Sequence, residues 1–260
     1  MKLDKFDSEF ARISPLAKIG KNVRIGNRAV IYDNVEIGDN SIICNDCIIG
    51  EPLNAYYSEG DQYENPKTVI GSNALIRSHT ILYAGNKIGD YFQTGHRTII
   101  REFNSIGNHC SIGNFTDIQG NCKFGNYCRL QSNIVVAETA VLGNFIFIYP
   151  YVVLTSDPMP PCNDVKAATI DDYTQIAAGC EILPNIHIGK HALLGAGSVI
   201  TKDVPDYKLV LGNPAKVVKD VREIIEPQTG LPHYPWPLRF DRGMPWAGKG
   251  YDNWLKEQDI

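Results

Sequence analysis

Residues 100–118 read IREFNSIGNHCSIGNFTDI, and isoleucine stands at every sixth position, at 100, 106, 112 and 118. Apolar residues keep this spacing in three blocks, which run from position 13 to 49, from 70 to 154 and from 170 to 200. In the middle block 13 of 15 such positions are Ile, Leu or Val, against roughly a quarter at ordinary composition. A period of six fits neither an amphipathic helix nor an alternating strand. It predicts a short strand, a corner and another strand.

Small residues mark the corners of this repeat. Thirteen of the 23 glycines follow the apolar residue directly, often with Asn or Asp next, as in Gly107-Asn108. These residue types tolerate the positive φ that tight corners require, so we expect them to turn the chain. Five of the seven cysteines stand four residues after the apolar position, where a small inward residue is wanted. We therefore interpret these cysteines as packing residues; they are Cys47, Cys110, Cys122, Cys128 and Cys180.

Composition limits the classes of function. The 260 residues fit one large domain, or one domain with a small appendage. The formal net charge of −4 argues against a nucleic-acid-binding protein. No apolar run approaches the roughly 18 residues of a membrane span, and the N-terminal MKLDKFDSEF lacks the apolar core of a signal peptide. We expect a cytoplasmic protein with no membrane span and no nucleic-acid partner.

The hexad resembles that of the hexapeptide-repeat family, over residues 13–204. The resemblance implies an all-β, left-handed parallel β-helix of about nine triangular coils, three hexads to a coil. We name the three faces A, B and C, with Ile70 on A, Ile76 on B and Leu82 on C. We expect a β-helix domain over 1–217, and a C-terminal part over 218–260 that begins with a short helix at 218–226 and continues as a Pro- and Trp-rich tail.

Two insertions interrupt the register, at 51–69 and 155–169. If the frame is kept, both leave the prism at the edge between faces C and A, about five coils apart. Long loops on a regular scaffold usually carry function.

A group of irregular hexads suggests where a binding site lies. His96 stands where Asn or Asp is usual, and Thr94 replaces the inward aliphatic residue. Ser78 precedes His96 by 18 residues, as His79 precedes Arg97, so these pairs should stack on one edge. Local sequence rules tend to fail at functional sites. A histidine, a carboxylate and several arginines on adjacent corners predict a site for an anionic substrate.

The C-terminal hexads resemble the closing coils of coenzyme-A-dependent hexapeptide acyltransferases, through Leu194–Pro205 and Leu211–Lys216. The resemblance implies acyl-CoA as a co-substrate and no tightly bound cofactor. It places the pantetheine arm beside small residues, with lysines near the coenzyme phosphates. The candidate CoA-binding residues are Ala178, Gly179, Ala196, Gly197, Lys202 and Lys216.

Shorter motifs point to a subgroup. Gln93–His96, Ile100–Glu102, both loops and the Tyr234-Pro235-Trp236 tail resemble N-acyltransferases of amino-deoxysugars carried on a nucleotide diphosphate, typically dTDP. The resemblance implies a homotrimer with active sites between subunits, working in surface polysaccharide synthesis. His96 would be the general base, and Glu102 would orient it or bind the amine. The candidate sugar-nucleotide residues are Arg77, Ser78, His79, Tyr83 and Arg101, with Tyr56 and Tyr57 as further partners for the base.

Several alternatives stay open at this point. His96 would be only a binding residue if the amine loses its proton through the thioester sulfur or water. A hexapeptide O-acetyltransferase acting on a simple sugar or serine shares the CoA end. A γ-carbonic-anhydrase-like protein needs three histidine ligands, and no histidine spacing here is convincing for a metal, so we expect none. A non-enzymatic β-helix subunit is the fourth reading. The acyl group, the position of the amine and the choice of dTDP or UDP are not determined.

Overall fold

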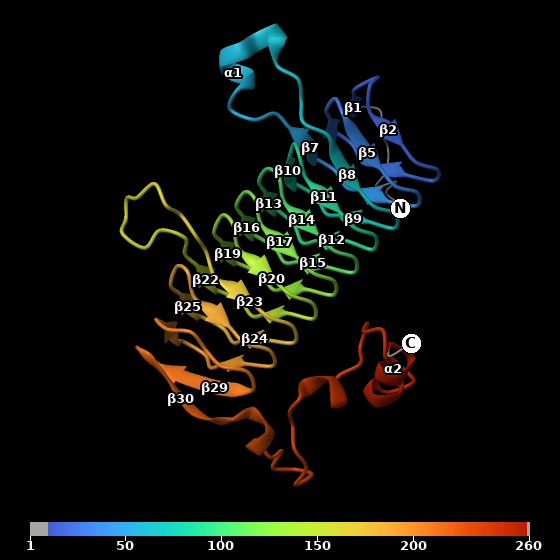
Figure 1. Ribbon diagram of the computed structural model, residues 1–260. Coiled ribbons are helices and arrows are strands. Elements are labelled where there is room, and N and C mark those ends of the chain that lie inside the picture. Colours follow the sequence, from blue (N-terminus) through green and yellow to red (C-terminus); the bar gives the residue numbers. More distant parts are fainter. Residues whose placement is uncertain (1–9, 259–260) are drawn as a thin grey trace.

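The structure, a computed structural model, describes residues 10–258 and is a parallel β-solenoid with three faces (Figure 1). Face A consists of β2 (Lys18–Ile19), β5 (Val35–Ile37), β8 (Thr68–Ile70), β11 (Lys87–Ile88), β14 (Ser105–Ile106), β17 (Lys123–Phe124), β20 (Val141–Leu142), β23 (Thr169–Ile170) and β26 (His187–Ile188). Face B consists of β3 (Arg24–Ile25), β6 (Ile42–Ile43), β9 (Leu75–Ile76), β12 (Gln93–Thr94), β15 (Ser111–Ile112), β18 (Arg129–Leu130), β21 (Phe147–Ile148), β24 (Gln175–Ile176), β27 (Leu193–Leu194), β29 (Lys208–Gly212) and β30 (Ala215–Asp220). Face C consists of β1 (Arg12–Ile13), β4 (Val30–Ile31), β7 (Ile48–Glu51), β10 (Ile81–Tyr83), β13 (Ile99–Ile100), β16 (Asp117–Ile118), β19 (Val135–Val136), β22 (Val153–Leu154), β25 (Glu181–Ile182) and β28 (Val199–Ile200).

The predicted left-handed β-helix is confirmed, and each repeat position ends or nearly ends one of the strands β1–β28. Neighbouring coils are in register at 18 residues, as in the pairing of Ile100 with Ile118. Within residues 10–258, face A holds nine strands, which equals the number of coils expected, whereas faces B and C hold eleven and ten. The surplus on face B arises because β29 continues that sheet past the last hexad and β30 pairs antiparallel with β29.

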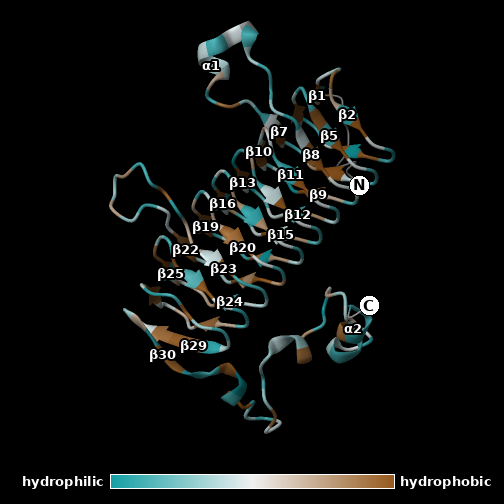
Figure 2. Cartoon of the chain, viewed as in Figure 1, coloured by the Kyte–Doolittle hydropathy of each residue, from teal (hydrophilic) through white to brown (hydrophobic). Residues whose placement is uncertain are grey.

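The core is the column of inward residues that the repeat supplies. Ile49, Ile76, Ile100 and Ile118 are almost completely buried, and their counterparts in most other coils are too. The five cysteines interpreted as packing residues are buried thiols, as predicted. In Figure 2 the apolar segments lie along the strands and the corners are mostly hydrophilic.

The corner glycines have a different reason from the one expected. Of the thirteen, only Gly50 has a positive φ; the left-handed residue is the one two places later, such as Tyr91 or Arg97. A Cβ on Gly95 would lie 2.3 Å from the backbone nitrogen of Asn114 in the next coil. The glycine is needed because that coil's Asn or Asp packs against it and accepts a hydrogen bond from the following backbone N–H. The prediction of positive φ at these glycines was therefore wrong.

Both insertions leave the edge between faces C and A, as predicted. The first follows β7 and contains α1 (Tyr56–Glu59) and η1 (Gly60–Gln62), and the second lies between β22 and β23. Five steps of the face C sheet separate β7 from β22. The two loops project from the same side of the solenoid (Figure 1).

The predicted helix at 218–226 is wrong. Residues 215–220 belong to β30, because the backbone of β29 offers them a partner, and only η2 (Val221–Glu223) forms a single helical turn. Strand β30 runs across the expected boundary at 217/218. The remaining helical segments are η3 (Trp236–Leu238) and α2 (Tyr251–Gln258). Within the described range of the chain, no helix is long and apolar enough to cross a membrane.

A ladder of stacked rings runs along the edge between faces A and B. Neighbouring ring centroids are 4.5–5.2 Å apart from Tyr91 to Tyr173, and 4.6 and 4.8 Å on either side of His191. The ladder consists of Tyr91, His109, Tyr127, Phe145, Tyr173, His191 and Tyr207. Trp246 and Trp254 of the tail pack against Phe145 in the middle of the ladder, so the tail is anchored on the prism.

The ladder makes stability depend on pH through His191. Burial between two rings lowers the pKa of His191 to about 4, despite the nearby carboxylates of Asp172 and Asp206. Its Nδ1 is buried without a hydrogen-bond partner in the structure. Because the folded pKa lies below the unfolded value, about 6.5, the contribution is complete above pH 6.5 and is lost as the pH falls towards 4.

We expect the His191→Phe variant to lose most of this dependence, since Phe145 fills an equivalent place in the ladder. Between pH 7.5 and 5 the wild-type free energy of unfolding should fall by about 1 kcal/mol more than that of the variant, a figure reduced for partial exposure. Urea midpoints at both pH values measure this. Equal pH slopes in the two proteins would contradict it.

Candidate active site

His96 lies at the corner between faces B and C, and its side chain is exposed. In three other coils the same place holds an Asn, and in two of them its Oδ1 accepts a backbone N–H of the preceding coil: Asn114 accepts from the N–H of His96 at 2.6 Å, and Asn45 from Asn27 at 3.0 Å. The remaining coils hold Ser78, Ser132, Pro150, Ala178 and Ala196 there. A histidine cannot reproduce that short amide contact. This corner therefore lacks a hydrogen bond that would stabilise the fold, which favours a functional role for His96.

Thr94 changes the backbone beneath this corner. Its Oγ1 accepts the N–H of Arg77 at 2.9 Å, and its freed carbonyl oxygen accepts from Nη1 of the same arginine at 2.7 Å. The Thr94 and Thr80 hydroxyls are 3.0 Å apart. The substitution that the sequence marked as irregular thus orients the Arg77 guanidinium along face B.

A depression of about 400 Å³ opens here, lined by Arg77, Gln93 and His96 among others. Ser78 and His79 lie one coil earlier at the same edge, where the carbonyl of Ser78 accepts the N–H of Arg97. Arg77, Ser78, His79 and His96 therefore share one edge, as the 18-residue spacing predicted.

The second group lies at the other edge of face C. Arg101 donates to Glu102 through Nη2 at 2.7 Å and Nε at 3.2 Å, and this ion pair raises the pKa of Arg101. The Glu102 carboxylate lies against Gly120, where a Cβ would come within 3.1 Å of Oε1. The remaining guanidinium N–H groups of Arg101 are available to an anion.

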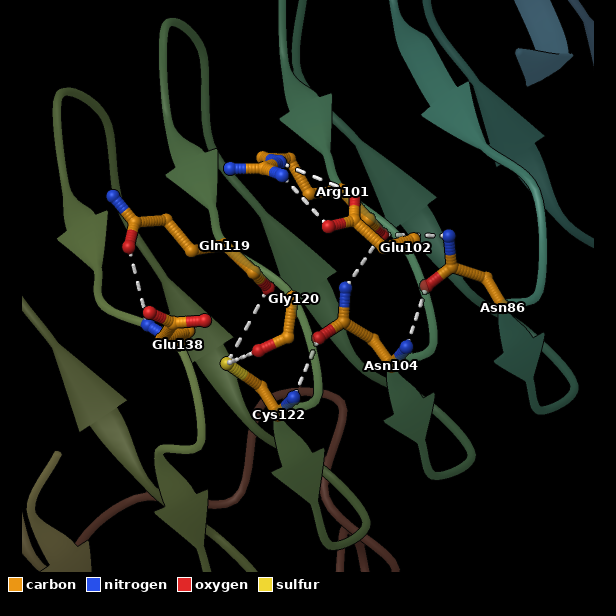
Figure 3. A network of polar contacts seen from close by, with 8 residues as sticks. All are labelled: Asn86, Arg101, Glu102, Asn104, Gln119, Gly120, Cys122 and Glu138. Carbon is orange, nitrogen blue, oxygen red and sulfur yellow. Dashed lines mark hydrogen bonds and ion pairs between the residues drawn. The ribbon is translucent and has the colours of Figure 1, made fainter. Parts of the chain in front are cut away.

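Two buried asparagines, which sequence analysis missed, support this corner (Figure 3). The Nδ2 groups of Asn86 and Asn104 both donate to the carbonyl of Arg101 at 2.7 Å. Asn86 accepts the N–H of Asn104, which in turn accepts the N–H of Cys122. The signal was present in the sequence, because both asparagines occupy the inward place that elsewhere holds a small or β-branched residue.

The first loop covers the Arg101–Glu102 corner. A pocket of about 430 Å³ is lined by loop residues including Tyr57, and by Tyr83, Arg101 and Glu102. Tyr56 is not in its wall and packs edge-on to Tyr57 instead, with ring centroids 5.3 Å apart. Tyr57 and Tyr83 thus stand near the arginine, whereas Tyr56 does not line this pocket.

Face C separates the two groups within one chain. His96 precedes β13 and Glu102 follows it, at opposite edges. The outward side chains between and around them are mostly apolar and are half-buried or exposed; they are Val30, Ile48, Ile81, Ile99, Val135, Val153 and Val199, interrupted by Asp117 and Glu181. A single chain therefore does not bring His96 and Glu102 together.

The C-terminal candidates also divide between edges. Ala178, Gly179, Ala196 and Gly197 lie on the same edge as His96 and are exposed. Gly179 and Gly197 have positive φ, but so do Arg97 and Phe115 at this edge, and a Cβ on Gly197 would touch nothing. Because these four residues carry a methyl group or no side chain, the surface beside them is open. The fold itself does not require such small residues here.

The two candidate lysines do not join this strip. Lys202 follows β28 at the opposite edge of face C, and Lys216 lies in β30. Both are exposed. Among residues 10–258 no group of three or more His, Cys, Asp or Glu could hold a metal ion.

Comparison with known proteins supports the repeat and the fold. Residues 16–51 and 167–202 match the family model described as bacterial transferase hexapeptide (six repeats). Serine acetyltransferase of Bacillus pumilus is 38% identical over 86 residues, which are 33% of this chain and 39% of that protein. Galactoside O-acetyltransferase of Lactococcus lactis is 30% identical over 90 residues, 32% of this chain and 44% of that protein.

Among solved structures, Arabidopsis UDP-N-acetylglucosamine acyltransferase superposes with a TM-score of 0.54 at 19% identity, over 81% of this chain and 72% of the other. This likeness concerns the fold alone. The chain spans less than half the length of the curated relatives it matches. Residues 16–51 and 167–202 thus match the hexapeptide of bacterial transferases, and the curated relatives that carry the similarity are acetyltransferases.

Proposed function

We propose that this protein is a coenzyme-A-dependent N-acyltransferase that transfers an acyl group from acyl-CoA to the amino group of a nucleotide-diphosphate-linked amino-deoxysugar. The observation that carries the proposal is the pair of incomplete sites on either side of an apolar face. One offers an exposed histidine, and the other an arginine, a carboxylate and tyrosines beneath a loop. The product, an acylated sugar that is still linked to its nucleotide, would serve as a building block for surface polysaccharides.

A homotrimer would complete the site. If face C of each copy points towards a threefold axis parallel to the solenoid, the edge that carries His96 meets the neighbour's edge that carries Glu102, because a cyclic interface joins two different surfaces. The apolar side chains of face C would be buried at the axis. At equal height, the neighbour's first loop faces His79 and His96, and its second loop faces Ala178.

The proposed chemistry is acyl transfer between the two edges. The neutral sugar amine attacks the thioester carbon, and the C–N bond forms as the carbonyl becomes an oxyanion. Backbone N–H groups at a corner stabilise that oxyanion. His96 takes the amine proton and delivers it to the departing sulfur as the C–S bond breaks, so free CoA leaves as a thiol. Glu102 of the neighbouring copy holds the amine or orients His96.

The sugar nucleotide would lie beneath the first loop. Its two phosphates need cations, and Arg77 and Arg101 offer guanidinium groups on the two edges that meet. Its base needs a flat partner, and Tyr57 and Tyr83 line the pocket next to Arg101.

O-acetylation of a simple sugar or serine is the second candidate. The names of the relatives favour it, since the matched proteins include serine acetyltransferases and a galactoside O-acetyltransferase. Such a substrate has no pyrophosphate, so it leaves the Arg101 pocket without a purpose.

Mass spectrometry of products from a panel of acceptors decides between them. The panel holds dTDP- and UDP-linked amino sugars, galactosides and serine, each with acetyl-CoA and longer acyl-CoAs. We expect an acylated product from a nucleotide amino sugar alone. Acetylation of serine or a galactoside at a higher rate would overturn the proposal in favour of the second candidate.

Glu102 provides a more local test. We expect Glu102→Ala to lower kcat/KM for the amino sugar about tenfold while the KM for acyl-CoA changes less than twofold, because the carboxylate serves the acceptor side. Gly120→Ala, which displaces the carboxylate without removing it, should give a smaller loss of the same kind. Steady-state kinetics with each substrate varied measure this. An unchanged amino-sugar kcat and KM in Glu102→Ala would remove Glu102 from the site.

A further inference from the structure

A third cavity, which shares only Ala178 with the sites described so far, lies between face B and the C-terminal tail. Its volume is about 360 Å³. Phe147 and Gln175 on face B form one wall, Trp236, Arg239 and Phe240 of the tail form the other, and Ala178 lies at its end on the B–C edge. The hexad repeat does not account for this cavity, because half of the wall comes from outside the solenoid.

The aromatic wall is rigid. Trp236 is only 4% exposed, and its Nε1 donates to the carbonyl of Tyr173 at 2.9 Å. Phe147 packs edge-on against Trp236 and Phe240, with centroids 4.8 and 5.5 Å apart. Three rings fixed in this way present faces and edges to a flat ligand without further loss of side-chain freedom.

Polar groups accompany the rings. Gln175 brings an amide that both donates and accepts hydrogen bonds, as the edge of a heteroaromatic base requires. Arg239 is exposed at the rim, and only its Nε is engaged, with the carbonyl of Pro232 at 3.2 Å. Its remaining N–H groups can meet a phosphate. Rings, one amide and one guanidinium together suit a nucleotide.

The position of the cavity fits one part of acyl-CoA. Along the B–C edge, backbone hydrogen bonds link His96 to the coils of Asn114, Ser132, Pro150 and Ala178 in turn. Four coils at the strand spacing amount to about 19 Å. The pantetheine arm has some fifteen bonds in its chain, which span roughly 18 Å when extended. With the thioester at His96, the nucleotide end of the coenzyme therefore reaches Ala178.

We propose that this cavity binds the adenine ring of acyl-CoA, packed against the rings of the tail and Phe147, with Arg239 at a coenzyme phosphate. The proposal rests on the proposed function, which puts the thioester at His96. The acyl group is excluded as the occupant by the same distance, since it lies beyond the thioester. The C-terminal tail thereby gains a role in binding the coenzyme.

The test compares acetyl-CoA with acetyl-pantetheine, which lacks the nucleotide, and titrates 3′,5′-ADP by calorimetry. We expect Arg239→Ala and Gln175→Ala each to raise the KM for acetyl-CoA at least fivefold and to weaken 3′,5′-ADP binding similarly. The kcat/KM for acetyl-pantetheine should stay within twofold. Lys256→Ala removes an equal charge from an exposed site on α2 and should change neither.

Two results would overturn the inference and leave the proposed function standing. One is wild-type protein that uses acetyl-CoA but neither binds 3′,5′-ADP nor prefers acetyl-CoA to acetyl-pantetheine. The other is an equal loss with both thioesters in the Arg239 and Gln175 variants. Wild-type protein that uses neither thioester with any acceptor would instead overturn the proposed function itself.

Discussion

Replacing His96 with asparagine should lower kcat/KM for acyl transfer at least tenfold and leave the solenoid intact. The loss is expected because proton transfer by a positioned base contributes about 10²–10⁴-fold to such reactions. Asparagine cannot take the amine proton, although it keeps a polar side chain at the corner. Steady-state kinetics on the preferred acceptor measure the effect. A loss of less than twofold would exclude His96 as the base.

The choice of asparagine makes this variant its own folding control. Asn45 and Asn114 fill the same place in other coils and accept a backbone N–H of the preceding coil. An asparagine at 96 should do the same towards the coil of Ser78, so its Tm should equal or exceed that of the wild type. A variant that has lost activity but melts no earlier therefore reports on chemistry. If the KM alone rises and kcat is kept, His96 binds substrate without acting as the base.

An aspartate at position 99 should dissociate the proposed trimer and lower activity more than a hundredfold. Ile99 projects from the middle of face C and is 38% exposed in the single chain, so the change is tolerated by the monomer. In the proposed trimer it would place three carboxylates near one axis in an apolar interface, where an unpaired charge costs several kcal/mol. In the proposed trimer, activity would depend on assembly because each site would take His96 from one copy and Glu102 from the next.

Val141→Asp is the matched control. Val141 is also a β-branched strand residue, 36% exposed, but it lies on face A, whose outward side chains are largely polar. It should leave both mass and activity unchanged. Sedimentation equilibrium and kinetics on the two variants test the pair of expectations. A fully active trimer with Ile99→Asp would mean that face C is not the interface.

The repeat could be predicted from the sequence because its inward position admits almost only apolar residues. The register from Ile13 to Ile200 therefore located the strands β1–β28, their faces and the common edge of both loops. The reason for the glycines was not predictable in this way, since it depends on how closely the next coil approaches Gly95. Residues 218–226 were misread because a local pattern does not show that β29 offers them a partner.

The site was predictable only in part. The irregular hexads around Thr94 and His96 pointed to one edge, and the 18-residue spacing grouped Arg77, Ser78 and His79 with them. The cavity beside Phe147 was not predictable, because its other wall comes from residues about 90 positions later. Such long-range contacts leave no periodic signal in the chain.

The hydrogen bonds that join each coil to the next have a consequence for substrate size. Since every corner repeats the same contact, a coil can be added or removed only as a whole. Distances along an edge are therefore quantised, in steps of about 4.8 Å. The separation between His96 and Ala178 is a whole number of such steps, as is the separation between the two loops. A relative with one coil more between these points would need a longer ligand. The number of coils therefore sets the length of the ligand that the edge accepts.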